Sequence, residues 1–363
     1  MPERRRKGCQ MHMPDGSHRS ATEAVQLAAA AAGDEEAFRR LTDHYRRELH
    51  VHCYRMLGSF HDAEDALQET FLRAWRHLAS FEGRSALRAW LYHIATNVCL
   101  TAAARPRVEP APPPVLVPPS AAHTAGIEQV THLSPYPDQL LDELEATAGN
   151  PVAHYDLRES VQLAFLAAVQ MLPPRQRAVL LLRDVLGWSS GEVAALLDST
   201  TASVNSALQR ARATVDQQHT EGRLGTVPTA SRDEIEQSLV RRYIEAWEAV
   251  DLDRLVELLR SDAVLTMPPF RLRYEGRRAI AEFFATIPSP GAVARRRLMP
   301  TRANRQPAVA AYMLDPGGLK HHASALVVLS VEAEAIAAIT GFVDPTLFPV
   351  FGLPTELESY HTT

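Results

Sequence analysis

The chain has 363 residues, a formal net charge of −5 and a charged fraction of 22%. That length predicts two or three domains, each large enough to bury its own core. The negative charge is unusual for a protein that binds nucleic acid alone, and it indicates that a DNA contact would be local or made beside a larger basic partner.

The three cysteines, Cys9, Cys53 and Cys99, have neither the spacing of a metal site nor the even number of a disulfide framework. We therefore expect reduced thiols. No apolar run approaches the length of a membrane span, and Arg4-Arg5-Arg6-Lys7 is not followed by the hydrophobic region of a signal peptide. These features predict a cytoplasmic protein with no membrane partner.

Residues 1–34 are expected to form a flexible N-terminal arm, with a helix near AVQLAAAAA as the alternative, and residues 35–105 a first helical domain. Three helices are predicted there, because apolar residues recur at helical spacing. The first contains Phe38, Leu41, Tyr45 and Leu49, the second covers 62–79, and the third begins near Ser85 and buries Leu87, Leu91, Ile94 and Val98.

The helix over 62–79 carries an acidic stripe, with Asp62 as its predicted N-cap. Asp65 and Glu69 are like charges four residues apart, which costs a few tenths of a kcal/mol in an isolated helix. A basic partner surface would turn this cost into attraction. A solvated acidic face is the alternative, and the pattern alone leaves both open.

The third helix combines cations with aromatic side chains, among them Arg88, Trp90 and Tyr92. Interleaved aromatic and arginine side chains suit a platform for unpaired bases, because every base offers a π-face for stacking. The alternative is that Trp90 and Tyr92 pack inside the domain.

Residues 106–150 form a linker, with seven prolines between Pro106 and Pro119. Proline lacks the N–H group that helix interiors and central strands need, so this segment is predicted to be an extended, semi-rigid spacer. The denser patch over 132–138 is a candidate docking segment, and a disordered tether is the alternative.

Residues 151–217 are predicted to form a second helical domain. A helix over 155–171 precedes Pro174, which suits the first turn of a following helix that Gly187 ends. Ser189 and Glu192 have the spacing of a capping box, so another helix begins there.

After the polar turn over 198–201, a last helix hides Val204, Leu208 and Ala211. Small polar residues near the start of this helix suit insertion into the major groove of DNA, in a helix-turn-helix arrangement. An ordinary helical hairpin is the alternative.

Two stretches together resemble a known family. DAEDALQETFLRAWRHLASFEGRSALRAWLYHIATNVCL resembles region 2 of the extracytoplasmic-function (ECF) group of sigma factors, in the sigma-70 superfamily. LPPRQRAVLLLRDVLGWSSGEVAALLDSTTASVNSALQRAR resembles region 4 of the same group. The resemblance covers about 35–105 and 155–217, and it implies a subunit that directs bacterial RNA polymerase to promoters.

The resemblance also implies three sets of contact residues. The acidic helix would dock on a coiled coil of the largest polymerase subunit through Asp62, Asp65, Leu67, Gln68, Glu69, Thr70 and Leu72. The loop at 80–85 and the next helix would melt and hold the minus-10 element through Phe81, Arg84, Arg88, Trp90, Tyr92 and Asn97. The last helix would read the minus-35 element through Thr201, Ser203, Asn205, Ser206, Gln209, Arg210 and Arg212, with Arg175 and Arg177 as further phosphate contacts.

After a polar linker over 218–232, residues 233–353 form a third predicted domain, followed by a C-terminal tail over 354–363. A first helical pattern and a second over 252–259, which follows an Asp251 cap, come before four strand-like runs. They predict an α+β domain with one curved sheet. The stretch YIEAWEAVDLDRLVELLRSDAVLTMPP resembles SnoaL-like domains, which include polyketide cyclases and steroid isomerases. The predicted fold class is therefore multidomain, with two all-α domains followed by an α+β SnoaL-like cone.

Such a cone holds a pocket between its sheet and helices. Its candidate lining residues are Tyr243, Trp247, Met267, Phe284, Tyr312, His321 and Phe342, although filling the core is the alternative for each. Asp262, Asp344, Tyr312 and His321 are candidate acids and bases, but no spacing singles out a catalytic pair.

The function predicted from this resemblance is promoter-specific initiation by a sigma factor whose third domain regulates it. The partners are core RNA polymerase and promoter DNA, no cofactor or metal is expected, and an anti-sigma factor or a small-molecule ligand at the third domain is left open. The alternatives are a stand-alone helix-turn-helix regulator and a cyclase or isomerase.

Overall fold

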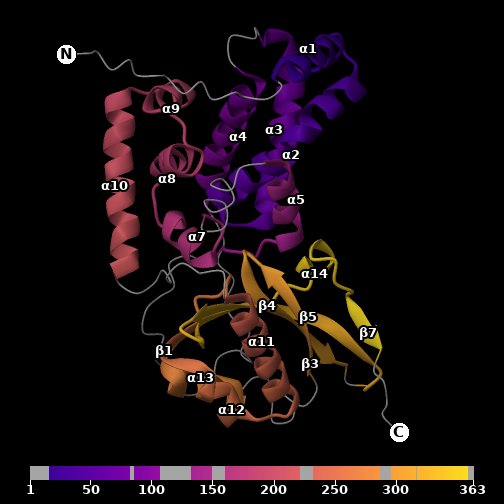
Figure 1. Ribbon diagram of the computed structural model, residues 1–363, viewed down its shortest axis with the longest axis vertical. Coiled ribbons are helices and arrows are strands. Elements are labelled where there is room, and N and C mark those ends of the chain that lie inside the picture. The colour runs from indigo at the N-terminus through magenta and orange to yellow at the C-terminus, as the bar shows by residue number, and fades with distance from the viewer. Residues whose placement is uncertain are drawn as a thin grey trace, which may run out of the picture.

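The computed structural model describes residues 16–81, 86–106, 132–148, 160–220, 232–286, 296–315 and 317–358. Helices fill one half of the molecule and a curved sheet fills the other, and the two halves are in contact (Figure 1). The proline-rich segment over 107–131 and the candidate minus-10 residue Arg84 lie outside the described residues, as does most of the linker over 218–232.

The first helical domain contains α1 (Gly16–Ala31), α2 (Glu35–Leu57), α3 (Phe60–His77), a 3₁₀ turn (Leu78–Ser80) and α4 (Leu87–Ala103). Within the expected N-terminal arm, the helix that AVQLAAAAA allowed is present as α1, and Ala30 packs in an apolar site beside Ala37 and Leu78. The N-cap of α3 is Ser59 and not Asp62, since the Ser59 hydroxyl accepts the backbone N–H of Asp62 at 3.2 Å.

The second helical domain contains α7 (Leu163–Gln170), α8 (Pro174–Leu180), a π-helical turn (Leu181–Val185), α9 (Ser190–Leu196) and α10 (Thr201–Thr220). The predicted capping box of α9 is present, with the Ser189 and Glu192 side chains each accepting the other's backbone N–H. Val204, Leu208 and Ala211 of α10 are buried as predicted.

The linker is docked over its denser patch at 132–138, and the helix that follows this patch was not expected. Residues 138–148 form α5 (Asp138–Ala148), and Tyr136 and Leu141 are fully buried. The proline content over 106–119 does not extend to this part of the linker, where DQLLDELEATA has apolar residues at helical spacing. The linker therefore ends in a docked helix.

The sheet domain begins with α11 (Arg232–Glu248) and α12 (Leu252–Glu257), whose N-cap is Asp251 as predicted. Its strands and remaining helices are β1 (Leu259–Thr266), β2 (Arg273–Glu275), α13 (Gly276–Thr286), β3 (Arg296–Ala303), β4 (Gln306–Leu314), β5 (Lys320–Glu332), β6 (Ala335–Phe342), α14 (Leu347–Val350) and β7 (Glu356–Glu358). The strand order is β2-β1-β6-β5-β4-β3, with β7 paired to β5. The predicted tail therefore contributes a strand to the sheet.

The two faces of the sheet bury different cores. Val309 and Ala311 of β4 face the core that the sheet shares with α11 and α13, whereas Ala308, Ala310 and Tyr312 join a second core. That second core continues through α14 and residues 133–141 into both helical domains. Because both faces are covered, residues 306–312 of β4 are buried without interruption.

Candidate functional site

The acidic stripe of α3 is open to solvent. Among its residues, Asp65 and Gln68 are exposed, Asp62 and Glu69 are half-buried, and 43% of Leu72 is exposed. Arg73 pairs with Glu69 at 2.6 Å, whereas Asp65 has no ion pair among the described residues. This face keeps an unbalanced negative charge around one apolar side chain.

Two residues that we expected on this face are instead part of the domain core. Leu67 is 4% exposed, and Thr70 is fully buried, with its hydroxyl donating to the Ala66 carbonyl at 2.7 Å. Both side chains point inward because they lie on the helix face that α2 and α4 cover.

The candidate minus-10 residues of α4 are engaged inside the molecule. Arg88 donates to both oxygens of Glu48 at 3.0 Å and lies 4.9 Å from the centre of the Tyr92 ring. Tyr92 is only 1% exposed and packs on Trp188 of the second helical domain, with ring centroids 5.4 Å apart. In this conformation Tyr92 offers no face to a base.

The remaining candidates of this region differ in exposure. Trp90 is half-buried and packs against Phe81, with ring centroids 5.0 Å apart. Asn97 is half-buried on α4. Phe81, directly after the 3₁₀ turn, and Trp90, in the first turn of α4, thus form an aromatic pair.

The candidate minus-35 residues share the solvent face of α10. The exposed ones are Thr201, Ser203, Asn205, Ser206, Gln209, Arg210 and Arg212. Asn205 accepts the Ser190 hydroxyl of α9 at 2.7 Å, and Arg212 pairs with Asp184 at 2.7 Å. This face has the exposure that a recognition helix requires.

Arg177 does not have the exposure of a phosphate contact. Its guanidinium is buried and donates to the carbonyls of Val169, Gln170 and Leu172 in its own domain, and to the carbonyl of Met56 in α2. Arg175 is exposed, with one hydrogen bond to the Leu197 carbonyl at 2.6 Å. Arg177 is therefore an internal support that joins the two helical domains.

A hairpin of the sheet domain inserts between these helical domains. Its turn is formed by Asn304 and Arg305, at φ 56° and 58°, which is the left-handed conformation that a two-residue hairpin needs. The Asn304 side chain is fully buried and donates to the Tyr54 hydroxyl of α2 at 2.8 Å and to the Val161 carbonyl at 2.6 Å. Its oxygen accepts the backbone N–H of Tyr136 at 2.8 Å.

We call Asn304 and its three hydrogen-bonding partners the junction: Tyr54, Tyr136, Val161 and Asn304. One amide thus connects α2, the docked linker and the start of the second helical domain, each of which supplies one hydrogen-bonding partner. His50 extends the junction, because its Nδ1 lies 2.7 Å from the Tyr136 hydroxyl. Burial lowers the pKa of His50 to about 4, so this imidazole is neutral at pH 7.

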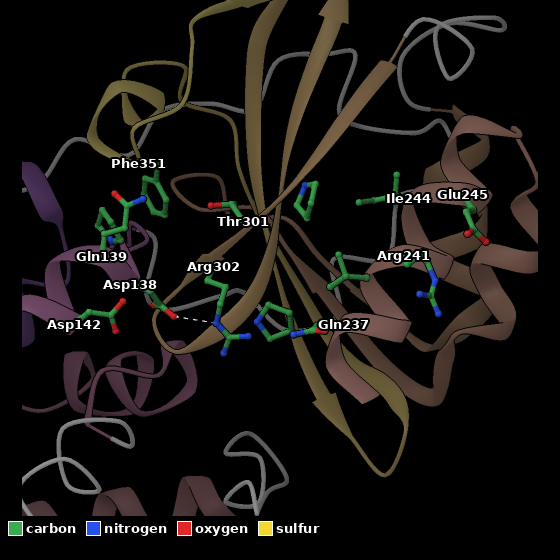
Figure 2. A pocket seen from close by; sticks show the side chains of 14 residues that line it. Asp138, Gln139, Asp142, Gln237, Arg241, Ile244, Glu245, Thr301, Arg302 and Phe351 are labelled. Atoms are coloured by element: carbon green, nitrogen blue, oxygen red, sulfur yellow. Dashed lines mark hydrogen bonds and ion pairs between the residues drawn. The ribbon is translucent and has the colours of Figure 1, made fainter. Parts of the chain in front are cut away.

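Charged side chains surround the junction. Asp138 accepts the backbone N–H of Arg305 at 2.7 Å and lies 3.3 Å from the Arg302 guanidinium, which also reaches Glu236 at 3.3 Å. Burial raises the pKa of Asp138, although the hydrogen bond from Arg305 opposes this shift. Figure 2 shows the Asp138–Arg302 pair beside a groove of about 640 Å³ whose walls come from α5, α11 and β3. The groove exists only while these elements stay docked.

A second cavity, of about 240 Å³, lies inside the sheet domain. Four of the predicted pocket residues line it: Tyr243, Trp247, Met267 and Phe284. Tyr312, His321 and Phe342 do not. Tyr312 and Phe342 face the other side of the sheet, and the Tyr312 hydroxyl donates to the Pro354 carbonyl at 3.0 Å. His321 is on β5 where β7 pairs with it.

Arg296 was not among the predicted pocket residues, and it lines this cavity together with Leu298 from alternate positions of β3. Three consecutive arginines precede Leu298, and the sequence does not distinguish the one that enters the cavity. Among the described lining residues there is no aspartate, glutamate or histidine. The candidate acid Asp262 is exposed and paired with Arg260 at 2.7 Å.

Family models match three successive parts of the chain: Sigma-70 region 2 over residues 41–107, Sigma-70 region 4 over residues 162–215 and a SnoaL-like domain over residues 240–339. The ECF RNA polymerase sigma factor SigG of Mycobacterium tuberculosis is 44% identical to the chain over 353 residues, or 92% of this chain and 90% of the relative. SigW of Bacillus subtilis is 29% identical over 180 residues, or 50% of this chain and 87% of that protein.

Among solved structures, the ECF sigma factor SigJ of Mycobacterium tuberculosis aligns with a TM-score of 0.52 and 21% identity, and the alignment covers 93% of this chain and 99% of that one. This likeness concerns the fold. It confirms the predicted fold class of helical domains followed by an α+β domain. Within the described residues, no helix is both long and apolar enough to cross a bilayer.

Proposed function

Because the chain belongs to the ECF RNA polymerase sigma factors, which bind core RNA polymerase and promoter DNA, we propose a surface for each of these partners. The acidic stripe of α3 docks on the polymerase through Asp62, Asp65, Gln68, Glu69 and Leu72. An exposed leucine surrounded by carboxylates fits a basic partner, since interface centres are apolar and their rims polar. The protein then acts in the cytoplasm, where this polymerase works.

Asp65→Arg tests the docking surface. We expect its affinity for core polymerase to fall by roughly 30-fold or more, because a like charge at an interface costs several kcal/mol. Binding of the labelled chain to core polymerase and run-off transcription measure this loss. Glu64→Arg is the matched control, because Glu64 is exposed on the same helix but off the stripe. Equal affinity of Asp65→Arg and the wild type would remove this surface from the proposal.

For promoter DNA, we propose that α10 reads the minus-35 element through its seven exposed polar residues named above. Four residues of α4, Arg88, Trp90, Tyr92 and Asn97, hold the opened minus-10 element together with Phe81. The centres of these two elements are about 25 base pairs apart, or about 85 Å at about 3.4 Å per base pair. Tyr92 and Trp188 of the two helical domains are in ring contact at 5.4 Å.

The Tyr92–Trp188 contact holds the two helical domains close together. A chain that spans both elements has to separate its helical domains, so the present arrangement is a closed state that precedes promoter binding. The junction supports this state, because Asn304 connects both helical domains to the sheet domain. We propose that the sheet domain regulates initiation by stabilising the closed state.

We propose no catalytic role for the sheet domain. Proton transfer needs an acid or base within reach of the bound molecule, and no carboxylate or imidazole lines the described wall of its cavity. The alternative of a cyclase or isomerase therefore lacks a candidate catalyst. A stand-alone helix-turn-helix regulator would leave the acidic stripe of α3 without a role.

A further inference from the structure

The cavity of about 240 Å³ in the sheet domain has an apolar wall with one charged group. Its lining comes from α11, α13 and the inner face of the sheet, and includes Trp247, Phe284 and Val309. Arg296 enters this wall from the start of β3. Its Nε lies 3.3 Å from the Met313 sulfur, and its guanidinium lies 5.1 Å from the centre of the Trp247 ring.

The Arg296 charge has no counter-ion among the described residues. No carboxylate there forms an ion pair with Arg296, and no aspartate or glutamate is among the described lining residues of the cavity. The Tyr243 phenol does not replace an acid, because burial raises its pKa to about 12 and it stays neutral at pH 7. Burial lowers the pKa of Arg296 itself, which reflects the cost of holding a cation in an apolar wall.

A second polar group in the same wall is also incomplete. The Trp247 indole nitrogen is buried and makes no well-aligned hydrogen bond among the described residues, although the Tyr243 phenol lies near it. Buried donors without acceptors are rare in folded proteins, because such a donor loses its hydrogen bonds to water on burial. An anionic oxygen in the cavity would offset both costs, because it accepts hydrogen bonds and pairs with the guanidinium.

We infer that this cavity binds a compact apolar monocarboxylate, whose carboxylate pairs with Arg296 and whose apolar part lies against Trp247 and Phe284. The volume limits the ligand, because an apolar cavity of about 150 Å³ already holds a benzene ring. A ring with a short acid chain, or a medium-length alkyl acid, therefore fits, whereas a dianionic phosphate would lose more hydration in an apolar wall. The inference goes beyond the proposed function, which does not require a ligand.

The test is calorimetric titration of the full chain with octanoate and 3-phenylpropionate, and with the corresponding neutral amides. The two acids distinguish an alkyl from an aryl ligand. We expect the acid that fits the cavity to bind about tenfold or more tightly than its amide, because only the carboxylate pairs with Arg296. Arg296→Met should remove this difference, whereas Arg296→Lys should keep part of it.

Arg297→Met is the matched control, because Arg297 is exposed at the neighbouring position of β3 and does not line the cavity. It should bind the acids as the wild type does. Equal binding of acid and amide by the wild type would overturn the inferred charge recognition, and this comparison needs no variant to fold. Failure of all four compounds to bind would overturn the ligand site. Neither result depends on polymerase, so the proposed function is tested separately.

Discussion

Asn304→Ala is expected to open the molecule and to raise promoter-directed transcription. The substitution removes the amide that donates to Tyr54 and Val161 and accepts from Tyr136. Leaving buried partners unsatisfied costs about 1–3 kcal/mol for each group. A net change of about 3 kcal/mol would take a chain that is about 1% open to about 60% open.

Small-angle scattering and run-off transcription measure the two expected effects, an increased radius of gyration and a higher yield per core polymerase bound. Glu334→Ala is the matched control. Glu334 also has a positive φ, of 67°, in a two-residue hairpin of the same sheet, but it is exposed. Both variants therefore place alanine at a position with left-handed backbone. Only the Asn304 position contacts the helical domains. A variant that expands without gaining activity would contradict the proposed regulation.

The helices were predictable where the sequence carries their end signals. Ser189 and Glu192 predict the start of α9 from their spacing alone, because a capping box is a local structure. Asp251 predicts the start of α12 in the same way. The start of α3 was placed wrongly at Asp62, because Ser59 is also a favourable cap and the sequence does not rank the two.

The junction was not predictable, because its partners are far apart in the sequence. Asn304 and Tyr54 are separated by 250 residues. An asparagine between two strand-like runs indicates a tight turn, but it says nothing about what the turn contacts. The same limit applies to Tyr92, whose helical position suits either exposure or burial until the second domain packs on it.

The cavity was predictable only in part, because the sheet is covered on both faces. Apolar alternation normally separates a buried face from a solvated one, but β4 is buried at 306–312 without interruption. The sequence therefore gives no sign that Tyr312 and Phe342 face the helical domains whereas Val309 faces the cavity. The register of each strand decides which aromatic side chain lines the cavity.

Arg177 stabilises the contact between the two helical domains through buried hydrogen bonds, so Arg177→Met should destabilise the chain strongly. Four carbonyls, those of Met56, Val169, Gln170 and Leu172, would lose their buried donor. We expect the free energy of unfolding to fall by about 3–5 kcal/mol, as when one partner of a buried charge network is removed. Denaturant unfolding measures this change.

Arg175→Met separates this structural role from a loss of charge near DNA. Arg175 lies two residues earlier on the same helix, is exposed, and donates one hydrogen bond, to the Leu197 carbonyl. Its substitution should cost about 1 kcal/mol or less, because an exposed group returns to water. If both variants unfolded at the same denaturant concentration as the wild type and only weakened DNA binding at low salt, Arg177 would be a phosphate contact and the closed state would lose one of its supports.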